Sequence, residues 1–109
     1  MVGISPVDNT AVQKAGEFVR EICASGVPLK TAYLFGSYAK GTPGTWSDID
    51  IALVSDVFIG VSFEDIKRFI DVTIKTPYML FEIHTFNAKD FEAGDSFVQE
   101  IKQTGIRIL

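Results

Sequence analysis

A chain of 109 residues, 47% apolar and 22% charged, is large enough for one hydrophobic core and too short for two, so we expect a single domain over residues 1–109. The formal net charge is −4 and the ten Lys and Arg residues are scattered, which argues against binding a long nucleic acid. No apolar run approaches the roughly 20 residues of a membrane span, and the N-terminus lacks the pattern of a secretory signal. We therefore expect a cytoplasmic protein without membrane contact.

Helical and extended patterns follow one another along the chain. Apolar residues at helical spacing predict helices over 8–25 and 62–76, and a weaker helix over 89–103 that Gly94 interrupts. Short aliphatic and aromatic runs predict strands over 31–35, 48–54, 78–86 and 106–109. This order predicts an α+β fold, a mixed α/β sandwich of helices on a small mixed β-sheet.

Several residues in these elements have specific expected environments. Cys23, the single cysteine, falls on the apolar stripe of the first helix, so packing is a better interpretation than chemistry. The spacing of Ser62 and Asp65 is typical of a capping box at the start of the second helix. Four apolar residues around Gly60 form either core or a partner surface: Phe58, Ile59, Val61 and Phe63.

Two aspartates lie one residue apart at the start of the second predicted strand. Asp48 and Asp50 project from the same strand face, roughly 6 to 7 Å apart, while Ile49, Ile51 and Leu53 take the other face. An isolated pair of this kind is more often a solvated strand face. Carboxylates this close repel one another, and divalent cations offset their charge. Oxygen ligands with no thiolate and only one histidine favour Mg²⁺ or Mn²⁺ over zinc.

A glycine-rich connection precedes the aspartates. Gly36 and Ser37 follow a strand directly, so their backbone N–H groups can cradle phosphate oxygens, and the Ser37 hydroxyl adds a donor. Lys40 lies close enough to contact a phosphate as well. Short glycine motifs alone are more often ordinary loops, so this interpretation depends on the acids that follow.

Residues 36–50 contain "GSYAKG", five further residues and then "SDID". This order resembles the signature of the DNA polymerase β-like nucleotidyltransferase superfamily: Gly-Ser, any residue, Ala, a basic residue, Gly, then Ser-Asp-x-Asp. The flanking runs "TAYLF" and "IALV" also fit, so the resemblance covers nearly the whole chain, and its specific part is 36–50. It implies a minimal, single-domain nucleotidyltransferase with the palm-like fold. It also implies nucleotide binding by four residues: Gly36, Ser37, Lys40 and Ser47.

The resemblance implies that Asp48, Asp50 and a third carboxylate from a later strand hold two Mg²⁺ ions, with Mn²⁺ as a substitute. Glu82 is the best third acid because it is the only acid within an otherwise apolar strand, although the family usually has Asp there. Otherwise Glu82 would be a charge that protects an edge strand from aggregation. His84 shares its strand face, but a lone strand histidine is usually structural, so it stays outside the catalytic set. Trp46 has no assigned role, and the base pocket is unassigned.

Family members transfer a nucleoside monophosphate from a triphosphate to a hydroxyl, with pyrophosphate leaving. The resemblance implies ATP as substrate and a HEPN-domain toxin protein as the partner that is adenylylated, which gives this chain an antitoxin role. One alternative is a non-catalytic subunit that neutralises or scaffolds its partner. Another is transfer to a small molecule such as an aminoglycoside. The sequence leaves formation of a homo-oligomer open.

Overall fold

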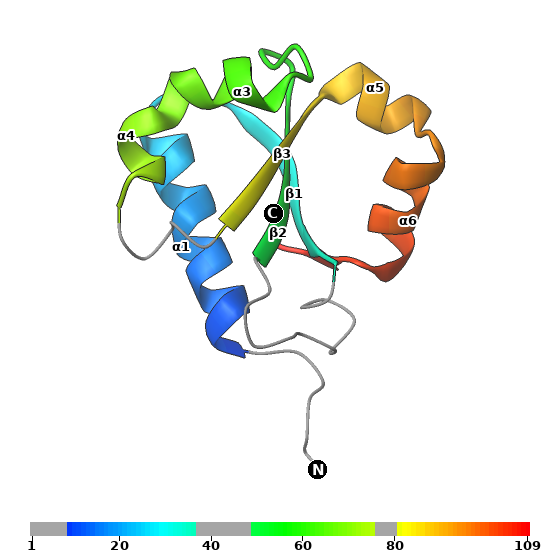
Figure 1. Cartoon of the computed structure of the whole chain (residues 1–109), viewed down its shortest axis with the longest axis horizontal. Coiled ribbons are helices and arrows are strands. Elements are labelled where there is room, and N and C mark those ends of the chain that lie inside the picture. Colours follow the sequence, from blue (N-terminus) through cyan, green and yellow to red (C-terminus); the bar gives the residue numbers. More distant parts are fainter. Residues whose placement is uncertain (1–8, 37–48, 76–80) are drawn as a thin grey trace.

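The computed structural model describes residues 9–36, 49–75 and 81–109. A four-stranded sheet lies between two layers of helices (Figure 1), which confirms the predicted mixed α/β sandwich. The strands follow the order β3-β2-β1-β4 in the sheet. Their bounds are β1, Leu29–Phe35; β2, Ile49–Ser55; β3, Phe81–Asn87; and β4, Ile106–Arg107.

Strand directions set where side chains meet. β1 pairs antiparallel with both β2 and β4, and β2 pairs parallel with β3. A parallel pair needs a crossover connection, and the helical segments between β2 and β3 provide it. The start of β2 therefore lies beside the start of β3 and beside the end of β1.

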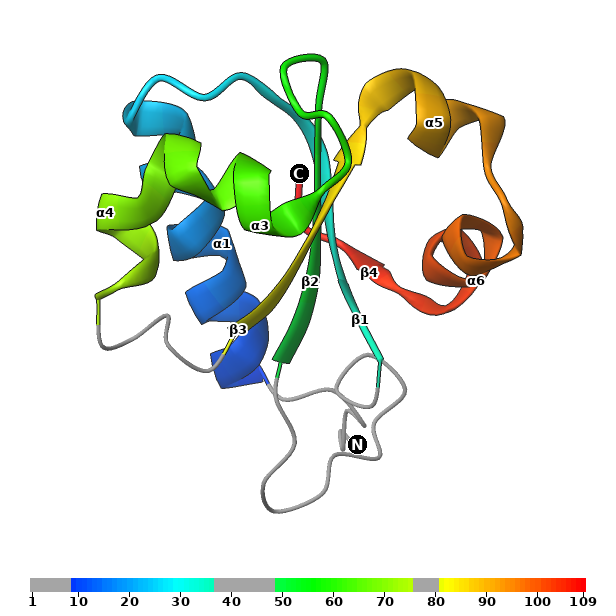
Figure 2. The same ribbon diagram turned by 45° about the horizontal axis from the view of Figure 1, so that its top comes forward.

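The first helix layer packs on one face of the sheet (Figure 2). Its segments are α1, Asn9–Ala24; α3, Ser62–Asp65; the 3₁₀ segment η1, Ile66–Phe69; and α4, Ile70–Thr73. The core beneath them includes Phe18, which stacks on Phe81 with ring centroids 5.0 Å apart. Ile51 and Leu53 of β2 are fully buried in the same cluster, on the face predicted for them.

The second helix layer covers the opposite face and consists of α5, Ala88–Ala93, and α6, Ser96–Thr104 (Figure 1). Phe91 and Ile101 pack there against Ala52 and Val54 of β2. The weaker helix predicted over 89–103, with Gly94 as its interruption, is present as these two shorter helices. Gly94, with φ +68°, separates the two helices at the position where the sequence predicted an interruption.

The predicted helix over 62–76 is wrong as a continuous element. It consists of α3, η1 and α4, and Phe69 leaves the helical region with φ −141° and ψ 31°. Phe69 is buried against Phe18 and Phe58, whose ring centroids lie 6.4 and 6.0 Å away. Packing of this ring into the core coincides with the break in the helical pattern.

The predicted capping box is wrong, because Asp65 is buried and binds elsewhere. Its carboxylate accepts the N–H groups of Ile59 and Gly60, each at 2.9 Å, and the Thr85 hydroxyl at 2.7 Å. The Ser62 hydroxyl accepts the N–H of Thr85 at 3.0 Å. These bonds attach the segment after β2 and the start of α3 to β3.

Two packing predictions are also settled. Cys23 is exposed, so its predicted packing role is wrong. The apolar cluster around Gly60 divides: Phe58 is buried in the core, and three side chains are exposed, namely Ile59, Val61 and Phe63.

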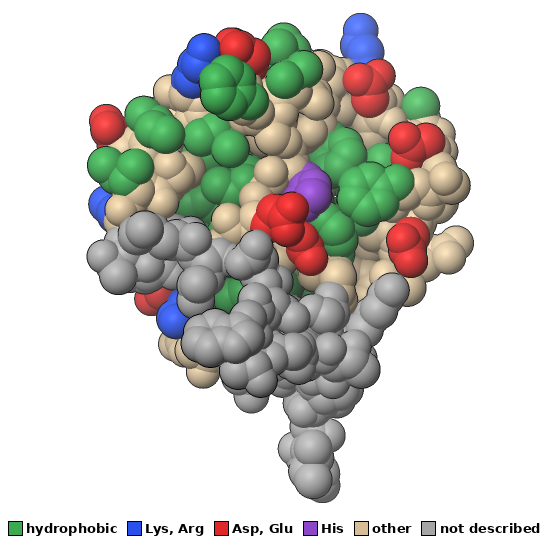
Figure 3. All heavy atoms as spheres, viewed as in Figure 1, with side chains coloured by type: hydrophobic (Ala, Val, Ile, Leu, Met, Phe, Trp, Pro, Cys, Tyr) green, Lys and Arg blue, Asp and Glu red, His purple; other side chains and the backbone are tan. Residues whose placement is uncertain are grey.

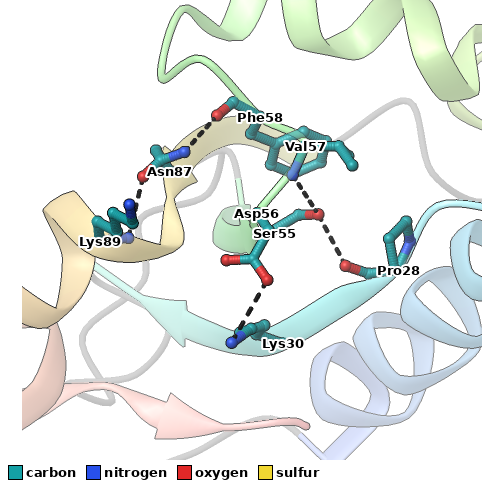
Figure 4. A network of polar contacts seen from close by, with 8 residues as sticks. All are labelled: Pro28, Lys30, Ser55, Asp56, Val57, Phe58, Asn87 and Lys89. Carbon is teal, nitrogen blue, oxygen red and sulfur yellow. Dashed lines mark hydrogen bonds and ion pairs between the residues drawn. The ribbon is translucent and has the colours of Figure 1, made fainter.

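A polar network fixes the end of the sheet where β2 and β3 finish (Figure 4). The Ser55 hydroxyl donates to the carbonyl of Pro28 and accepts the N–H of Val57. The Asn87 amide donates to the carbonyl of Phe58 at 2.9 Å. These bonds hold the end of the sheet where β2 and β3 finish. The predicted site residues Asp50 and Glu82 lie at the other end, where the two strands begin. In the described ranges, no helix combines the length and apolar composition that crossing a bilayer requires.

Candidate metal and nucleotide site

The candidate site lies where β1 ends and β2 and β3 begin. Phe35 is opposite Asp50 in the β1–β2 pair, and Asp50 is opposite Glu82 in the β2–β3 pair. His84 follows two residues after Glu82, so both side chains leave the same face of β3. This face is the one covered further along by α5 and α6, because Ala52 and Val54 pack against those helices.

Three polar side chains converge at this point. His84 Nε2 lies 3.3 Å from Asp50 Oδ1 and 4.0 Å from Glu82 Oε1. One ligand atom from each residue falls within 4.8 Å of the other two. The side chains of Asp50 and His84 are 23% and 29% exposed, and that of Glu82 is 56% exposed. Acidic side chains beside the single histidine are visible on the surface in Figure 3.

Gly36 brings the backbone against this cluster. Its φ is +76°, a conformation that L side chains rarely adopt. A Cβ at this position would overlap Asp50 Oδ2 and lie 3.1 Å from Asp50 Cγ. The first glycine of the motif is therefore required by the close approach of the backbone to the Asp50 carboxylate.

Aromatic rings form one wall of the site. The His84 ring contacts Phe35 edge to face, with centroids 5.0 Å apart, and lies 6.1 Å from the ring of Phe97 in α6. Phe97 is 42% exposed. Beside it is a cavity of about 140 Å³ whose lining joins the end of β1 to α6: Phe35, Gly36, Phe97, Glu100, Ile101 and Thr104.

The donor set fits a divalent cation. The two carboxylate oxygens suit Mg²⁺ or Mn²⁺, and the imidazole nitrogen is a donor that transition-metal ions accept. Gly36, Asp50 and Glu82, three of the residues predicted from the sequence, are brought together here.

Four predicted site residues lie outside the described residues: Ser37, Lys40, Ser47 and Asp48. Their roles stay predictions, and Trp46 lies outside as well.

Sequence reasoning left out two residues that border the site. His84 had a usable signal, because its spacing of two from Glu82 already placed it on the same strand face. Phe97 had none, because α6 reaches the site through tertiary packing and its sequence distance from the motif is large.

Comparison with known proteins supports the interpretation of this geometry. The sequence profile of the nucleotidyltransferase domain family matches residues 17–108. A protein from Sulfolobus solfataricus, provisionally described as a nucleotidyltransferase, has a similar solved structure with a TM-score of 0.64 and 19% identity, over 98% of this chain and 89% of that chain. A toxin–antitoxin structure with AMP-PNP gives a TM-score of 0.57 and 19% identity, over 86% of this chain and 72% of that chain. A search of curated protein sequences found no match. The profile match confirms the family resemblance inferred from the motif, and the structural likenesses show the fold.

Proposed function

Because this chain belongs to the nucleotidyltransferase domain family, we propose that it transfers AMP from ATP to a hydroxyl of a HEPN-type partner protein, as the antitoxin of a pair. The observation that carries the proposal is the convergence of Gly36, Asp50 and Glu82 at one end of the sheet. A phosphate-binding turn and carboxylates suited to divalent cations are both needed for phosphoryl chemistry on a triphosphate.

In this proposal the carboxylates of Asp48, Asp50 and Glu82 hold two Mg²⁺ ions, or Mn²⁺ in their place. Such ions, when bound, neutralise the phosphate oxygens and lower the pKa of the attacking hydroxyl. The phosphates lie along the connection after β1, where the residues that hold them are Gly36, Ser37, Lys40 and Ser47.

The reaction is an in-line displacement at the α-phosphorus. The acceptor oxygen forms a bond to that phosphorus, the bond to the bridging oxygen breaks, and pyrophosphate leaves with the bonding electron pair. The proton of the acceptor hydroxyl passes to the Glu82 carboxylate, which is exposed enough to meet a macromolecular acceptor.

We place the nucleobase against the ring of Phe97. This ring is partly exposed, lies 6.1 Å from the ring of His84 and borders the cavity of about 140 Å³. A base stacks on an exposed aromatic face without needing a specific hydrogen-bonding edge. The geometry therefore supports nucleotide binding without selecting a base, and adenine is taken from the family resemblance.

Two observations support a protein as the acceptor. A structural neighbour was solved as a toxin–antitoxin pair with AMP-PNP. In this chain, three large apolar side chains near the start of α3 are exposed: Ile59, Val61 and Phe63. Large apolar side chains exposed within one short segment are typical of protein-binding surfaces.

The test is incubation with Mg²⁺ and ATP labelled at the α-phosphorus, together with the partner encoded beside this chain. We expect label on the partner with the unchanged protein and none with Asp50→Asn. The matched control is Asp56→Asn, because Asp56 is exposed, pairs with Lys30 and lies at the opposite end of β2. ATP labelled at the γ-phosphorus should leave the partner unlabelled, since pyrophosphate is the leaving group.

Each alternative gives a different result. Partner binding without label transfer would refute the enzymatic proposal and favour a subunit that neutralises its partner by contact. Label on an added aminoglycoside, with none on protein, would replace the protein acceptor by a small molecule.

A further inference from the structure

The imidazole of His84 is held with one nitrogen directed at the carboxylates. Its ring contacts Phe35 edge to face at 5.0 Å and Phe97 at 6.1 Å, and its Nε2 is the atom nearest Asp50 and Glu82. The side chain is 29% exposed, so packing restricts the ring while part of the side chain stays open to solvent.

The distances between the donor atoms match those around one octahedral ion. For ligand bonds of 2.0–2.1 Å, neighbouring ligand atoms lie about 3 Å apart and opposite ones about 4 Å. His84 Nε2 is 3.3 Å from Asp50 Oδ1 and 4.0 Å from Glu82 Oε1. The nitrogen is therefore close enough to both oxygens for the three atoms to share an ion after small side-chain adjustments.

We infer that His84 is itself a metal ligand, and that it makes the ion between Asp50 and Glu82 one that prefers Mn²⁺ to Mg²⁺. The inference rests on the metal site of the proposed function and adds a ligand that the carboxylate motif does not contain. Both ions bind carboxylates, but Mg²⁺ is a hard cation that is held through oxygen ligands, whereas Mn²⁺ is a first-row transition-metal ion, the class of ion that binds nitrogen as well as oxygen ligands. His84 thus determines the choice of metal.

The direct test is pulsed electron paramagnetic resonance of the untagged full chain loaded with Mn²⁺ alone. The chain has a single histidine, so an imidazole ¹⁴N coupling to the bound Mn²⁺ would identify His84 without any variant. We expect this coupling in the unchanged protein. Separate titrations should show tighter binding of Mn²⁺ than of Mg²⁺.

The variant His84→Phe keeps a ring against Phe35 and Phe97 and removes the nitrogen. We expect the ¹⁴N coupling to disappear, and the Mn²⁺ affinity to fall by roughly 10- to 100-fold, the loss typical when even an outer partner of a metal ligand is removed. Mg²⁺ affinity should change much less. His84→Asn is the second variant, because it keeps a polar side chain if Phe disturbs folding, and it should lose the coupling as well.

The outcomes separate this inference from the proposed function. Bound Mn²⁺ without imidazole coupling would overturn the role of His84 and leave the carboxylate site standing. Equal loss of Mn²⁺ and Mg²⁺ in His84→Phe would also overturn it, since a residue that only holds Asp50 in place affects both ions alike. Failure to bind either ion would overturn the metal site itself, independently of any label-transfer result.

Discussion

Gly36→Ala is expected to disable the candidate site through a collision with Asp50. The methyl carbon would overlap Asp50 Oδ2 and lie 3.1 Å from Cγ, so the carboxylate must rotate away from its present position. Gly26→Ala is the matched control, because Gly26 also has a positive φ, +107°, but has nothing within 4 Å of an added Cβ. Both variants place alanine at a positive φ, and only Gly36→Ala brings the new methyl group against the Asp50 carboxylate.

The magnitudes follow from these two effects. A left-handed φ costs a residue with a Cβ about 1–2 kcal/mol, and the stiffer unfolded chain offsets about 0.4–1 kcal/mol of this. We therefore expect Gly26→Ala to lower the free energy of unfolding by about 1 kcal/mol. In Gly36→Ala, forcing the Asp50 side chain from its rotamer adds about 0.5–1.5 kcal/mol, for a total of about 2 kcal/mol.

The informative measurement is metal binding, with stability as the reference. Urea unfolding in a chelator gives the two free energies of unfolding, and the signal of free Mn²⁺ gives the two affinities. We expect Gly36→Ala to lose roughly tenfold or more in Mn²⁺ affinity, since Asp50, one of the proposed metal ligands, is displaced, while Gly26→Ala binds like the unchanged protein. Unchanged binding in Gly36→Ala would refute the argument that the close approach fixes the carboxylate. Equal loss in both variants would show that the effect is global.

Asp65→Asn should lower the free energy of unfolding by about 3 kcal/mol. The Asp65 carboxylate accepts hydrogen bonds from several donors, including the Thr85 hydroxyl, and the NH₂ group of asparagine would face a donor in place of an acceptor oxygen. Urea unfolding checks this against the exposed control Asp71→Asn, and equal stability of the two variants would contradict it. Phe97→Ala should weaken ATP binding by about 1–3 kcal/mol through the lost stacking surface. Calorimetric titration checks this against Phe63→Ala, which removes a more exposed ring from the other helix layer; equal weakening would refute base stacking on Phe97.

Strand geometry was the part of the site that could be predicted from the sequence. The alternation of a strand is a local property, so the apolar residues Ile51 and Leu53 fixed which face Asp50 takes before any partner strand was known. The same alternation put Glu82 and His84 on one face of β3. Only the tertiary structure shows that β2 and β3 pair in parallel, with Asp50 opposite Glu82.

Predictions from short sequence patterns were wrong where a side chain formed hydrogen bonds or packed with groups outside its own helix. Ser62 and Asp65 have capping-box spacing, but the carboxylate finds the N–H groups of Ile59 and Gly60, which the sharp turn after β2 presents to it. The periodic run after Ser62 likewise favours one helix, yet the buried ring of Phe69 sits at a break in it. Helical spacing predicts which residues are buried better than it predicts continuous hydrogen bonding.

The position of Glu82 and His84 depends on how β3 is held. Among the described strands β3 ends the sheet order, so its backbone has one strand partner, β2. Thr85 adds a second attachment, because its N–H and hydroxyl bind Ser62 and Asp65 on the crossover side. An edge strand held on one side only can shift its register at low cost, and a one-residue shift would turn Glu82 and His84 away from Asp50. The buried Asp65 therefore stabilises the fold and also keeps the candidate ligands on β3 facing Asp50 on β2.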